Sequence, residues 1–421
     1  MTFNNICVIG LGYIGLPTAA IFASKGMKVL GVDIDQTTID TINQGKIHII
    51  EPGLDKLVNS AVKSGHLRAA KTPESSDAFL IAVPTPFKKN NSQVPQPDLS
   101  YIEKASDAIA PFLKKGDLVI LESTVPVGTT EQLAEWLQNS RPDLNFTKDY
   151  HDEVDINIAH CPERVLPGQI LKELVRNDRV IGGITMNCSK RAIELYGKFV
   201  TGECIITNAR TAEMAKLTEN SCRDVEIAFA NELSMICDEL DIDVWELISL
   251  SNRHPRINIL KPGPGVGGHC IAVDPWFIIS KTPKKAQLMR MARFVNNTKP
   301  DWVMNKVKIT ITDFLQKHPD KTIIDITIAC YGLTFKADID DLRESPALNI
   351  AQKIAATHPG KVLAVEPNID NLLSIDTMID LSTFPFAQEH ADIHLLLVDH
   401  KEFKDSKFKS EYLIDTKGIW N

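Results

Sequence analysis

Cys270 lies in a glycine-rich segment that could present a covalent nucleophile. Residues 263–275 read GPGVGGHCIAVDP, in which five of the seven residues before Cys270 are glycine or proline. Little side-chain bulk stands in such a segment, so a ligand can lie against its backbone while the thiol points at it. Asp274 and Pro275 are typical of a helix start, where a nearby thiol ionises more readily and becomes more nucleophilic. A buried, unreactive cysteine remains the alternative at this point.

Lys216, Asn220 and Arg223 could serve the same chemistry from one helix face. They are spaced four and three residues apart in a stretch, Thr211 to Leu240, that has no proline or glycine. Residues at these spacings line up along a helix. A row of cationic and amide donors can stabilise the oxyanion formed when a thiol adds to a carbonyl. A solvated helix face is the default explanation of the same pattern.

A dinucleotide site is indicated by the first turn of the chain. Gly10-Leu11-Gly12-Tyr13-Ile14-Gly15 follows a short apolar run and precedes a helical pattern. The three glycines suit a tight turn, the approach of a pyrophosphate to the backbone, and close packing of helix against strand. Asp33 follows 18 residues after Gly15 and can bind both ribose hydroxyls, which favours NAD over NADP.

Two later loops are expected beside the nicotinamide half of the cofactor. Pro84-Thr85-Pro86 and Ser123-Thr124-Val125-Pro126 each follow a strand-like segment, and parallel sheets bind ligands at the carboxyl ends of their strands. Each could equally be an ordinary turn. The expected cofactor contacts are Gly10, Gly12, Tyr13, Ile14, Gly15, Asp33, Thr85 and Thr124.

Alternating strands and helices must position these groups. The pattern predicts two Rossmann-like, doubly wound parallel-sheet domains of the α/β class, joined by a central helical domain with one long helix. The expected boundaries are 1–207 for the NAD-binding domain, 208–318 for the helical domain and 319–421 for the second sheet domain. The expected strands are 5–10, 28–35, 78–83, 118–122 and 156–160, then 323–331, 361–365, 393–398 and 412–415, with helices at 16–25, 211–240, 284–318 and 345–357.

Composition narrows the class of protein further. The net charge of −8 argues against a general nucleic-acid binder. Eight cysteines show no CxxC pair, so neither a metal site nor a disulfide framework is indicated, and those other than Cys270 are interpreted as core residues. The apolar stretch 6–23 is interrupted by glycines and lacks a preceding basic residue, so we expect a cytoplasmic protein without a membrane span.

Together these motifs resemble the nucleotide-sugar 6-dehydrogenases, the UDP-glucose/GDP-mannose dehydrogenase family. The resemblance runs in order through GLGYIGLP, the PTP loop, ESTVPVGT, CPER, AEMAKLTEN, GPGVGGHCIAVDP and GLTFKADIDDLRESPA. It implies a four-electron oxidation of a UDP-sugar at C6 with two NAD, in a homodimer or higher oligomer built on the central helices. Such enzymes supply acidic sugars for surface polysaccharides. His269 before the thiol, and the absence of a Lys after it, depart from the glucose-specific members.

The resemblance also implies roles for individual residues. Cys270 corresponds to the nucleophile and Lys216 to the general acid/base, with Asn220 beside it. Glu163, Asp274 and Thr124 correspond to residues that hold or activate water, and Arg256 to an arginine that reaches the neighbouring subunit's site. The matched substrate-contacting positions are Arg164, Val165, Lys216, Asn220, Arg223, His254, Arg256, Gly267, Phe335, Lys336 and Arg343.

The substrate within the family is predicted from one segment. Residues 252–278, with His254-Pro255-Arg256, resemble members that oxidise the N-acetylmannosamine epimer. Members acting on UDP-N-acetylglucosamine usually have Pro in place of Ala272 and lack the HPR segment. That epimer and UDP-glucose remain alternatives. A two-electron dehydrogenase, for which Cys270 would be dispensable, and a catalytically inactive NAD-binding assembly protein are more distant ones.

Overall fold

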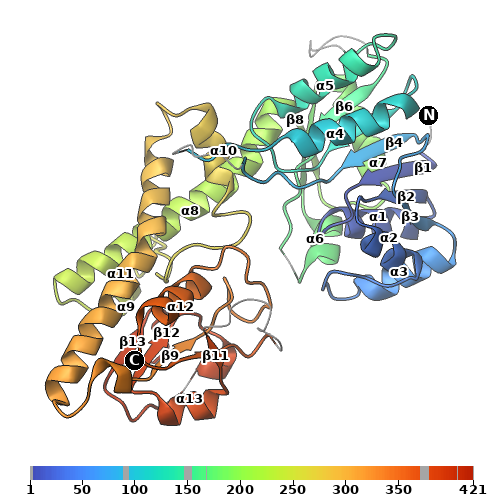
Figure 1. Cartoon of the computed structure of the whole chain (residues 1–421). Helices are drawn as coiled ribbons and strands as arrows, with labels where there is room; N and C mark the ends of the chain where they lie inside the picture. The colour runs from blue at the N-terminus through green and yellow to red at the C-terminus, as the bar shows by residue number, and fades with distance from the viewer. Residues whose placement is uncertain are drawn as a thin grey trace. The chain divides into compact units, whose positions relative to one another are not determined.

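The computed structural model describes residues 3–88, 94–146, 154–166, 168–369, 379–404 and 406–420. The chain forms two compact units, each with its own sheet (Figure 1). Unit 1 comprises residues 1–219 and 276–282, and unit 2 comprises residues 220–275 and 283–421. The predicted fold class is confirmed, with two Rossmann-like sheets and a long helix, α8 (Ala209–Glu239), where 211–240 was expected.

The sheet of unit 1 has its strands in the order β3-β2-β1-β4-β5-β6-β7-β8. Neighbouring strands are parallel except that β7 runs antiparallel to β6, so β7 and β8 both run opposite to β1–β6. The reversal was not predicted, and it is possible because antiparallel neighbours need no crossover of the sheet. The strands are β1 (Asn5–Ile9), β2 (Lys28–Val32), β3 (Leu67–Ala70), β4 (Ala78–Ile81), β5 (Leu118–Leu121), β6 (Asn157–His160), β7 (Arg179–Gly183) and β8 (Cys204–Asn208).

Both faces of this sheet are covered, which explains why its strands are almost continuously apolar. Along β1, Ile6 and Val8 enter one core cluster while Cys7 and Ile9 enter the other, as the alternation of side chains requires. Helices on the first face are α1 (Gly15–Ser24), α2 (Gln36–Asn43), α3 (Leu54–Lys63), α6 (Ile170–Arg176) and α7 (Met186–Tyr196). On the second face are α4 (Ser100–Ile109), extended by the 3-10 turn η1 (Ala110–Phe112), and α5 (Thr129–Ser140).

Unit 2 contains a five-stranded parallel sheet in the order β11-β10-β9-β12-β13. Helices α11 and α12 pack on one face, and α13 packs on the other. The strands are β9 (Ile328–Tyr331), β10 (Val362–Val365), β11 (Asp380–Leu381), β12 (Ile393–Leu396) and β13 (Leu413–Asp415). The other elements of unit 2 are α9 (Val244–Ser251), α11 (Gln287–Lys317), α12 (Pro346–Thr357), α13 (Phe384–His390) and the 3-10 turn η3 (Lys401–Phe403). Helix α10 (Asp274–Lys281) begins in unit 2, and its residues from Trp276 on belong to unit 1.

Two expectations need correction. The strand expected over 323–331 begins only at Ile328, because residues 323–325 form a 3-10 turn, η2 (Ile323–Asp325). Thr322 and Asp325 bond each other's backbone N–H groups, and such local side-chain bonds compete with a strand. Cys222 is exposed on α8 and is not a core residue. Among the described helices, none has both the length and the sustained hydrophobicity that a bilayer crossing requires.

Candidate active site

The predicted site residues divide between the two units, and each set is described within its own unit. Unit 2 contains Asn220, Arg223, His254, Arg256, Gly267, Cys270, Asp274, Phe335, Lys336 and Arg343. Unit 1 contains Gly10, Gly12, Tyr13, Ile14, Gly15, Asp33, Thr85, Thr124, Glu163, Arg164, Val165 and Lys216.

The first turn has the geometry of a dinucleotide site. Gly10 has φ +90°, and a Cβ there would lie 2.6 Å from the carbonyl oxygen of Ala82, so only glycine fits. A Cβ on Gly12 would meet nothing within 4 Å, which leaves the backbone open to a ligand. Helix α1 begins at Gly15 without a side-chain cap, so its first N–H groups can face phosphate charge. These features fit NAD.

Asp33 is held in a fixed orientation at the end of β2. Its Oδ2 accepts the Leu11 N–H at 2.9 Å and its Oδ1 accepts the Asp35 N–H at 3.0 Å. The residue is only half-buried, so the carboxylate can still accept hydrogen bonds from ribose hydroxyls. Tyr13, which is 37% exposed, and Ile14 stand just before α1.

The two loops expected at the nicotinamide are bonded to each other. The Thr85 hydroxyl donates to the carbonyl of Thr124 at 2.8 Å, and the Ser123 hydroxyl donates to the carbonyl of Val83 at 2.7 Å. Both threonines are half-buried. The loops that follow β4 and β5 therefore form one rigid edge, as the parallel topology predicts.

Glu163 is a buried carboxylate with an ionic partner. It is 8% exposed, its Oε2 accepts from Arg179 at 3.1 Å, and its Oε1 accepts the N–H of Arg164 at 2.8 Å. The Arg164 guanidinium forms an ion pair with Glu219 at 2.6 Å. Val165 is half-buried and packs against the first core cluster, so it has a structural role beside any contact with substrate.

The start of α8 is fixed by a buried carboxylate one turn before the half-buried Lys216. Glu213 accepts the N–H of Gly128 at 2.6 Å and the N–H of Thr130 at 2.7 Å. These are donors at the start of α5, which has no cap of its own. Glu213 therefore ties the helix that carries Lys216 to the segment after Thr124.

Cys270 lies in the turn just before α10, which begins at Asp274 as expected. The carbonyl of Cys270 accepts the N–H groups of Val273 and Asp274 at 3.1 and 2.9 Å, and Cys270 itself is exposed. The Asn220 side chain donates to the buried carboxylate of Asp274 at 2.5 Å. The structure thus brings two of the predicted residues, Asn220 and Asp274, into contact one helical turn after the thiol.

The glycines before Cys270 allow the loop that carries Phe335 and Arg343 to approach closely. A Cβ on Gly267 would lie 2.5 Å from the carbonyl of Glu344 and 2.8 Å from the Cβ of Phe335. Gly268, with φ +79°, donates its N–H to the carbonyl of Arg343 at 3.2 Å. The Arg343 guanidinium bonds Asp341 at 2.6 to 3.0 Å, so its charge is partly neutralised.

The remaining predicted residues are exposed. Lys336 is exposed beside Phe335, and Arg223 forms a surface ion pair with Glu226 at 3.6 Å. His254 and Arg256 lie in an exposed loop after α9, where the Arg256 N–H donates to His254 at 3.3 Å. Their exposure suits contact with a large ligand or a second chain.

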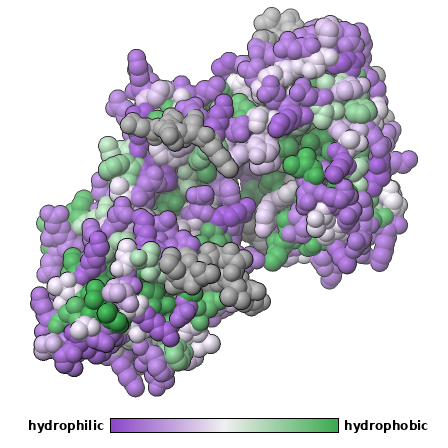
Figure 2. Space-filling model, viewed as in Figure 1, coloured by the Kyte–Doolittle hydropathy of each residue, from purple (hydrophilic) through white to green (hydrophobic). Residues whose placement is uncertain are grey.

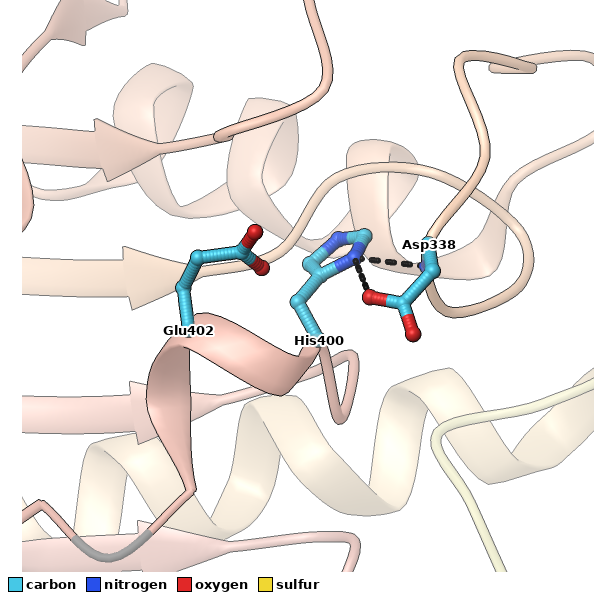
Figure 3. A group of neighbouring side chains, drawn as sticks. All are labelled: Asp338, His400 and Glu402. Carbon is cyan, nitrogen blue, oxygen red and sulfur yellow. Dashed lines mark hydrogen bonds and ion pairs between the residues drawn. The ribbon is translucent and has the colours of Figure 1, made fainter.

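One cluster has the residue types of a metal site. Ligand-type atoms of Asp338, His400 and Glu402 lie within 4.8 Å of one another, with His400 between the two carboxylates (Figure 3). However, His400 Nδ1 accepts the N–H of Asp338 at 2.9 Å, and its Nε2 is 3.1 Å from the carboxylate of Glu366. Because hydrogen bonds engage both ring nitrogens, the cluster supports the loop and does not indicate a metal.

Sequence reasoning missed the supporting residues Arg179, Glu213, Glu366 and His400. Glu366 had a signal, because a glycine after β9 and an acid after β10 repeat the pattern of Gly10 and Asp33. Arg179 had none, since it reads as an ordinary polar residue at a strand start.

Comparisons with known proteins agree along the whole chain. Three domain models of the UDP-glucose/GDP-mannose dehydrogenase family match: the NAD binding domain over residues 4–200, the central domain over 210–298 and the UDP binding domain over 329–421. A UDP-N-acetyl-D-mannosamine dehydrogenase of Yersinia pestis is 58% identical over the full length of both chains.

Two other relatives match over nearly the whole chain. An NDP-N-acetyl-D-galactosaminuronic acid dehydrogenase of Ralstonia nicotianae is also 58% identical, over 100% of this chain and 97% of its own. The solved structure of a UDP-D-ManNAc dehydrogenase from Pyrococcus horikoshii is 37% identical, with a TM-score of 0.86 over 99% of this chain and 96% of that one.

Proposed function

The chain belongs to the UDP-glucose/GDP-mannose dehydrogenase family of NAD-dependent enzymes, and within it we propose that this protein oxidises UDP-N-acetyl-D-mannosamine twice at C6, to UDP-N-acetyl-D-mannosaminuronate. The observation that carries the chemistry is the exposed Cys270 in the turn before α10, four residues before Asp274 of the bonded pair Asn220–Asp274. We also propose the division into domains 1–207, 208–318 and 319–421. The protein acts in the cytoplasm, where its product is used for the synthesis of surface polysaccharides.

Cys270 supplies the covalent step. The turn from Gly10 to Asp33 would hold NAD, which would supply the hydride acceptor for each of the two oxidations at C6. Lys216 accepts the proton of the C6 hydroxyl in the first oxidation, which leaves an aldehyde. The Cys270 thiolate forms a bond to the aldehyde carbon, and Lys216 and Asn220 stabilise the resulting oxyanion. The second oxidation of this thiohemiacetal gives a thioester on Cys270.

Water then releases the product. Glu163, Thr124 and Asp274 hold the water and Glu163 accepts its proton, so that a C–O bond forms at the thioester carbon. The C–S bond breaks, its electron pair stays on the sulfur of Cys270, and the carboxylate leaves. A thiol is needed because an aldehyde gives up hydride readily only after a nucleophile has added to it.

The substrate proposal rests on the relatives and on one loop. The relatives from Yersinia and Ralstonia are equally identical to this chain, so overall identity does not decide between mannosamine and galactosamine sugars. The exposed loop with His254 and Arg256 supports mannosamine, because it matches the segment that distinguishes the mannosamine members.

We also propose a homodimer formed through the helices of unit 2. The inner faces of α8 and α11 pack together through Ala228, Ala292 and Val295. Large apolar side chains stay exposed on these helices although the visible face of the molecule is mainly hydrophilic (Figure 2). They are Phe229, Ile236, Leu288, Met291 and Phe294, between 47% and 69% exposed. In this dimer, Arg256 reaches the site of the neighbouring subunit.

The test is to count NADH per sugar consumed. Purified protein is incubated with excess NAD and, separately, the UDP-activated N-acetyl forms of mannosamine, glucosamine and galactosamine. We expect about two NADH per sugar, with the mannosamine compound strongly preferred. One NADH per sugar would remove the thioester route. Two NADH with another sugar preferred would keep the chemistry and overturn the substrate assignment.

A further inference from the structure

A buried group of charged and aromatic side chains lies directly behind Glu163 in unit 1. Arg179, the first residue of β7, is 5% exposed and donates to the Glu163 carboxylate at 3.1 Å. Its guanidinium carbon lies 4.4 Å from the ring centre of Tyr196, at the end of α7, and 5.7 Å from that of Phe199. Arg179 is therefore held between the Glu163 carboxylate and two aromatic faces.

The far side of this group reaches a second part of the proposed site. The Tyr196 hydroxyl donates to the carboxyl group of Glu122 at 2.5 Å. Glu122 is 2% exposed, follows β5, and stands two residues before Thr124. The buried group thus connects the segment that carries Glu163 with the segment that carries Thr124, the two residues of unit 1 to which the proposed function assigns the hydrolytic water.

The charges of this group are costly to bury. Burial raises the pKa of the Glu122 carboxyl to about 7, against the attraction of Arg179 and with the repulsion of Glu163. Cys161, also buried here, has its pKa raised well above the usual value by burial. Well-packed apolar side chains often stabilise a fold as much as a buried ion pair does. The free-energy cost of burying these charges is explained if the charge on Arg179 has a function at Glu163.

We propose that Arg179 is a positioning residue for hydrolysis of the thioester, with Tyr196 and Glu122 holding its guanidinium in place. Through its 3.1 Å contact, Arg179 fixes the Glu163 carboxylate in one orientation, ready to accept a proton from the attacking water. The proposal rests on the proposed function, since it concerns the step after both oxidations. It predicts that a change at Arg179 slows release of the acid while leaving both oxidations intact.

The experiment follows the thioester on Cys270 during turnover. Arg179→Lys keeps the positive charge but loses the fork that can bond Glu163 and stack on Tyr196. Stopped-flow absorbance should show a burst of NADH followed by a steady state about 100-fold slower than in the wild type. Mass spectrometry of acid-quenched enzyme should find the sugar acid bound to Cys270. Hydroxylamine, a nucleophile that needs no activated water, should restore part of the turnover.

Two comparison variants separate a positioning role from loss of stability. Arg293→Lys changes another buried arginine, paired with Asp224 at 2.7 Å in unit 2, and should lower stability without accumulating thioester. Tyr196→Phe keeps the ring beneath Arg179 and removes one hydroxyl, so that Glu122 competes for the guanidinium. It should slow hydrolysis about 3-fold to 10-fold, and it supplies the measurement if Arg179→Lys does not fold.

Glu163→Gln distinguishes the two possible failures. If Glu163→Gln accumulates thioester while the folded Arg179→Lys and Tyr196→Phe enzymes do not, the positioning role is wrong and the proposed function stands. If Glu163→Gln yields no thioester on Cys270, the assigned hydrolytic step fails first, and the positioning role falls with it. Equal accumulation in Arg293→Lys would show a general effect of destabilisation and would also overturn the proposal.

Discussion

The two sheets contain the same strand-and-turn arrangement, but its carboxylate is used differently in each. In unit 1, Asp33 accepts the N–H of Leu11 at 2.9 Å and remains half-buried, open to ribose hydroxyls. In unit 2, Glu366 accepts the N–H of Leu333 at 2.7 Å, but its side chain is fully buried against His400 at 3.1 Å. The second carboxylate thus contacts a buried imidazole, whereas the first stays partly open to solvent.

The difference shows how one local structure can serve either as a cofactor site or as a support. Glu366 also accepts the N–H groups of Thr334 and Asn368, at 3.2 and 3.0 Å. It therefore fixes the start of the loop that carries Phe335 and Lys336. We expect the first turn to govern NAD affinity and the second to govern stability and sugar binding.

The largest effects are expected at the two glycines that begin these turns. Gly10 and Gly332 have φ +90° and +86°, and an added Cβ would strike the carbonyl of Ala82 or the side chain of Val398. Replacing either by alanine should lower the free energy of unfolding by about 3 kcal/mol or more, measured by denaturant titration. Gly12→Ala is the control, because its Cβ meets nothing within 4 Å and should weaken NAD binding alone. Unchanged stability in Gly332→Ala would contradict the claim that the two turns share one arrangement.

Glu366→Gln should give the next largest effect. Loss of the buried charge beside His400 should lower the free energy of unfolding by about 2 to 3 kcal/mol and raise KM for the sugar, with NAD affinity unchanged. Glu402→Gln is the matched control, since Glu402 also lies near His400 but is exposed, and its replacement should change stability little. A weaker affinity for NAD in Glu366→Gln would contradict the assignment of NAD binding to the first turn and of stability and sugar binding to the second.

Asp33→Asn should act mainly on the cofactor. Loss of a charged acceptor for two ribose hydroxyls should weaken NAD binding about 10-fold to 100-fold. Asn has one acceptor oxygen where Asp33 uses two, so one of the backbone bonds to Leu11 and Asp35 is lost as well. Fluorescence titration with NAD measures the loss of affinity. A parallel titration with NADP measures how far discrimination against the 2′-phosphate is reduced. If NAD binding is unaffected, Asp33 is not the ribose partner.

The smallest effects are expected in the pH dependence of stability. Burial would raise the pKa of Glu366, but hydrogen bonds from His400 and from the Leu333 N–H hold it below its ordinary value of 4.5. A carboxylate with a lowered pKa stabilises the fold above pH 4.5, and this stabilisation is lost as pH falls through the folded pKa. Unfolding of unit 2, followed between pH 6 and about 3, should therefore be less acid-sensitive in Glu366→Gln than in the wild type.

The contribution of Glu122 in unit 1 to stability should have the opposite pH dependence. Burial raises its pKa to about 7, so the folded state holds a proton that the unfolded state releases near pH 4.5. Its contribution to stability therefore declines as pH rises from 4.5 to about 7. Glu122→Gln should remove that decline, which urea titrations at pH 5.5 and 8 would reveal as a smaller difference than in the wild type.

Sequence reasoning succeeded where the signal is local. Gly10, Gly12 and Asp33 belong to one strand–turn–helix–strand segment, and the helix start at Asp274 follows from that residue and its neighbour. Contacts between distant segments carry no such signal. The bond between Asn220 and Asp274 spans 54 residues, and the pair His400–Glu366 spans 34. The direction of β7 also depends on packing that no local pattern encodes.

The central claim, that Cys270 carries the sugar through the second oxidation, is tested most directly by Cys270→Ala. The variant and the wild type are incubated with NAD and UDP-N-acetylmannosamine, and both NADH and acidic sugar are measured. The account predicts two NADH and one uronate per sugar for the wild type. For the variant it predicts at most one NADH per sugar and no uronate. Formation of uronate with two NADH by Cys270→Ala would contradict the account.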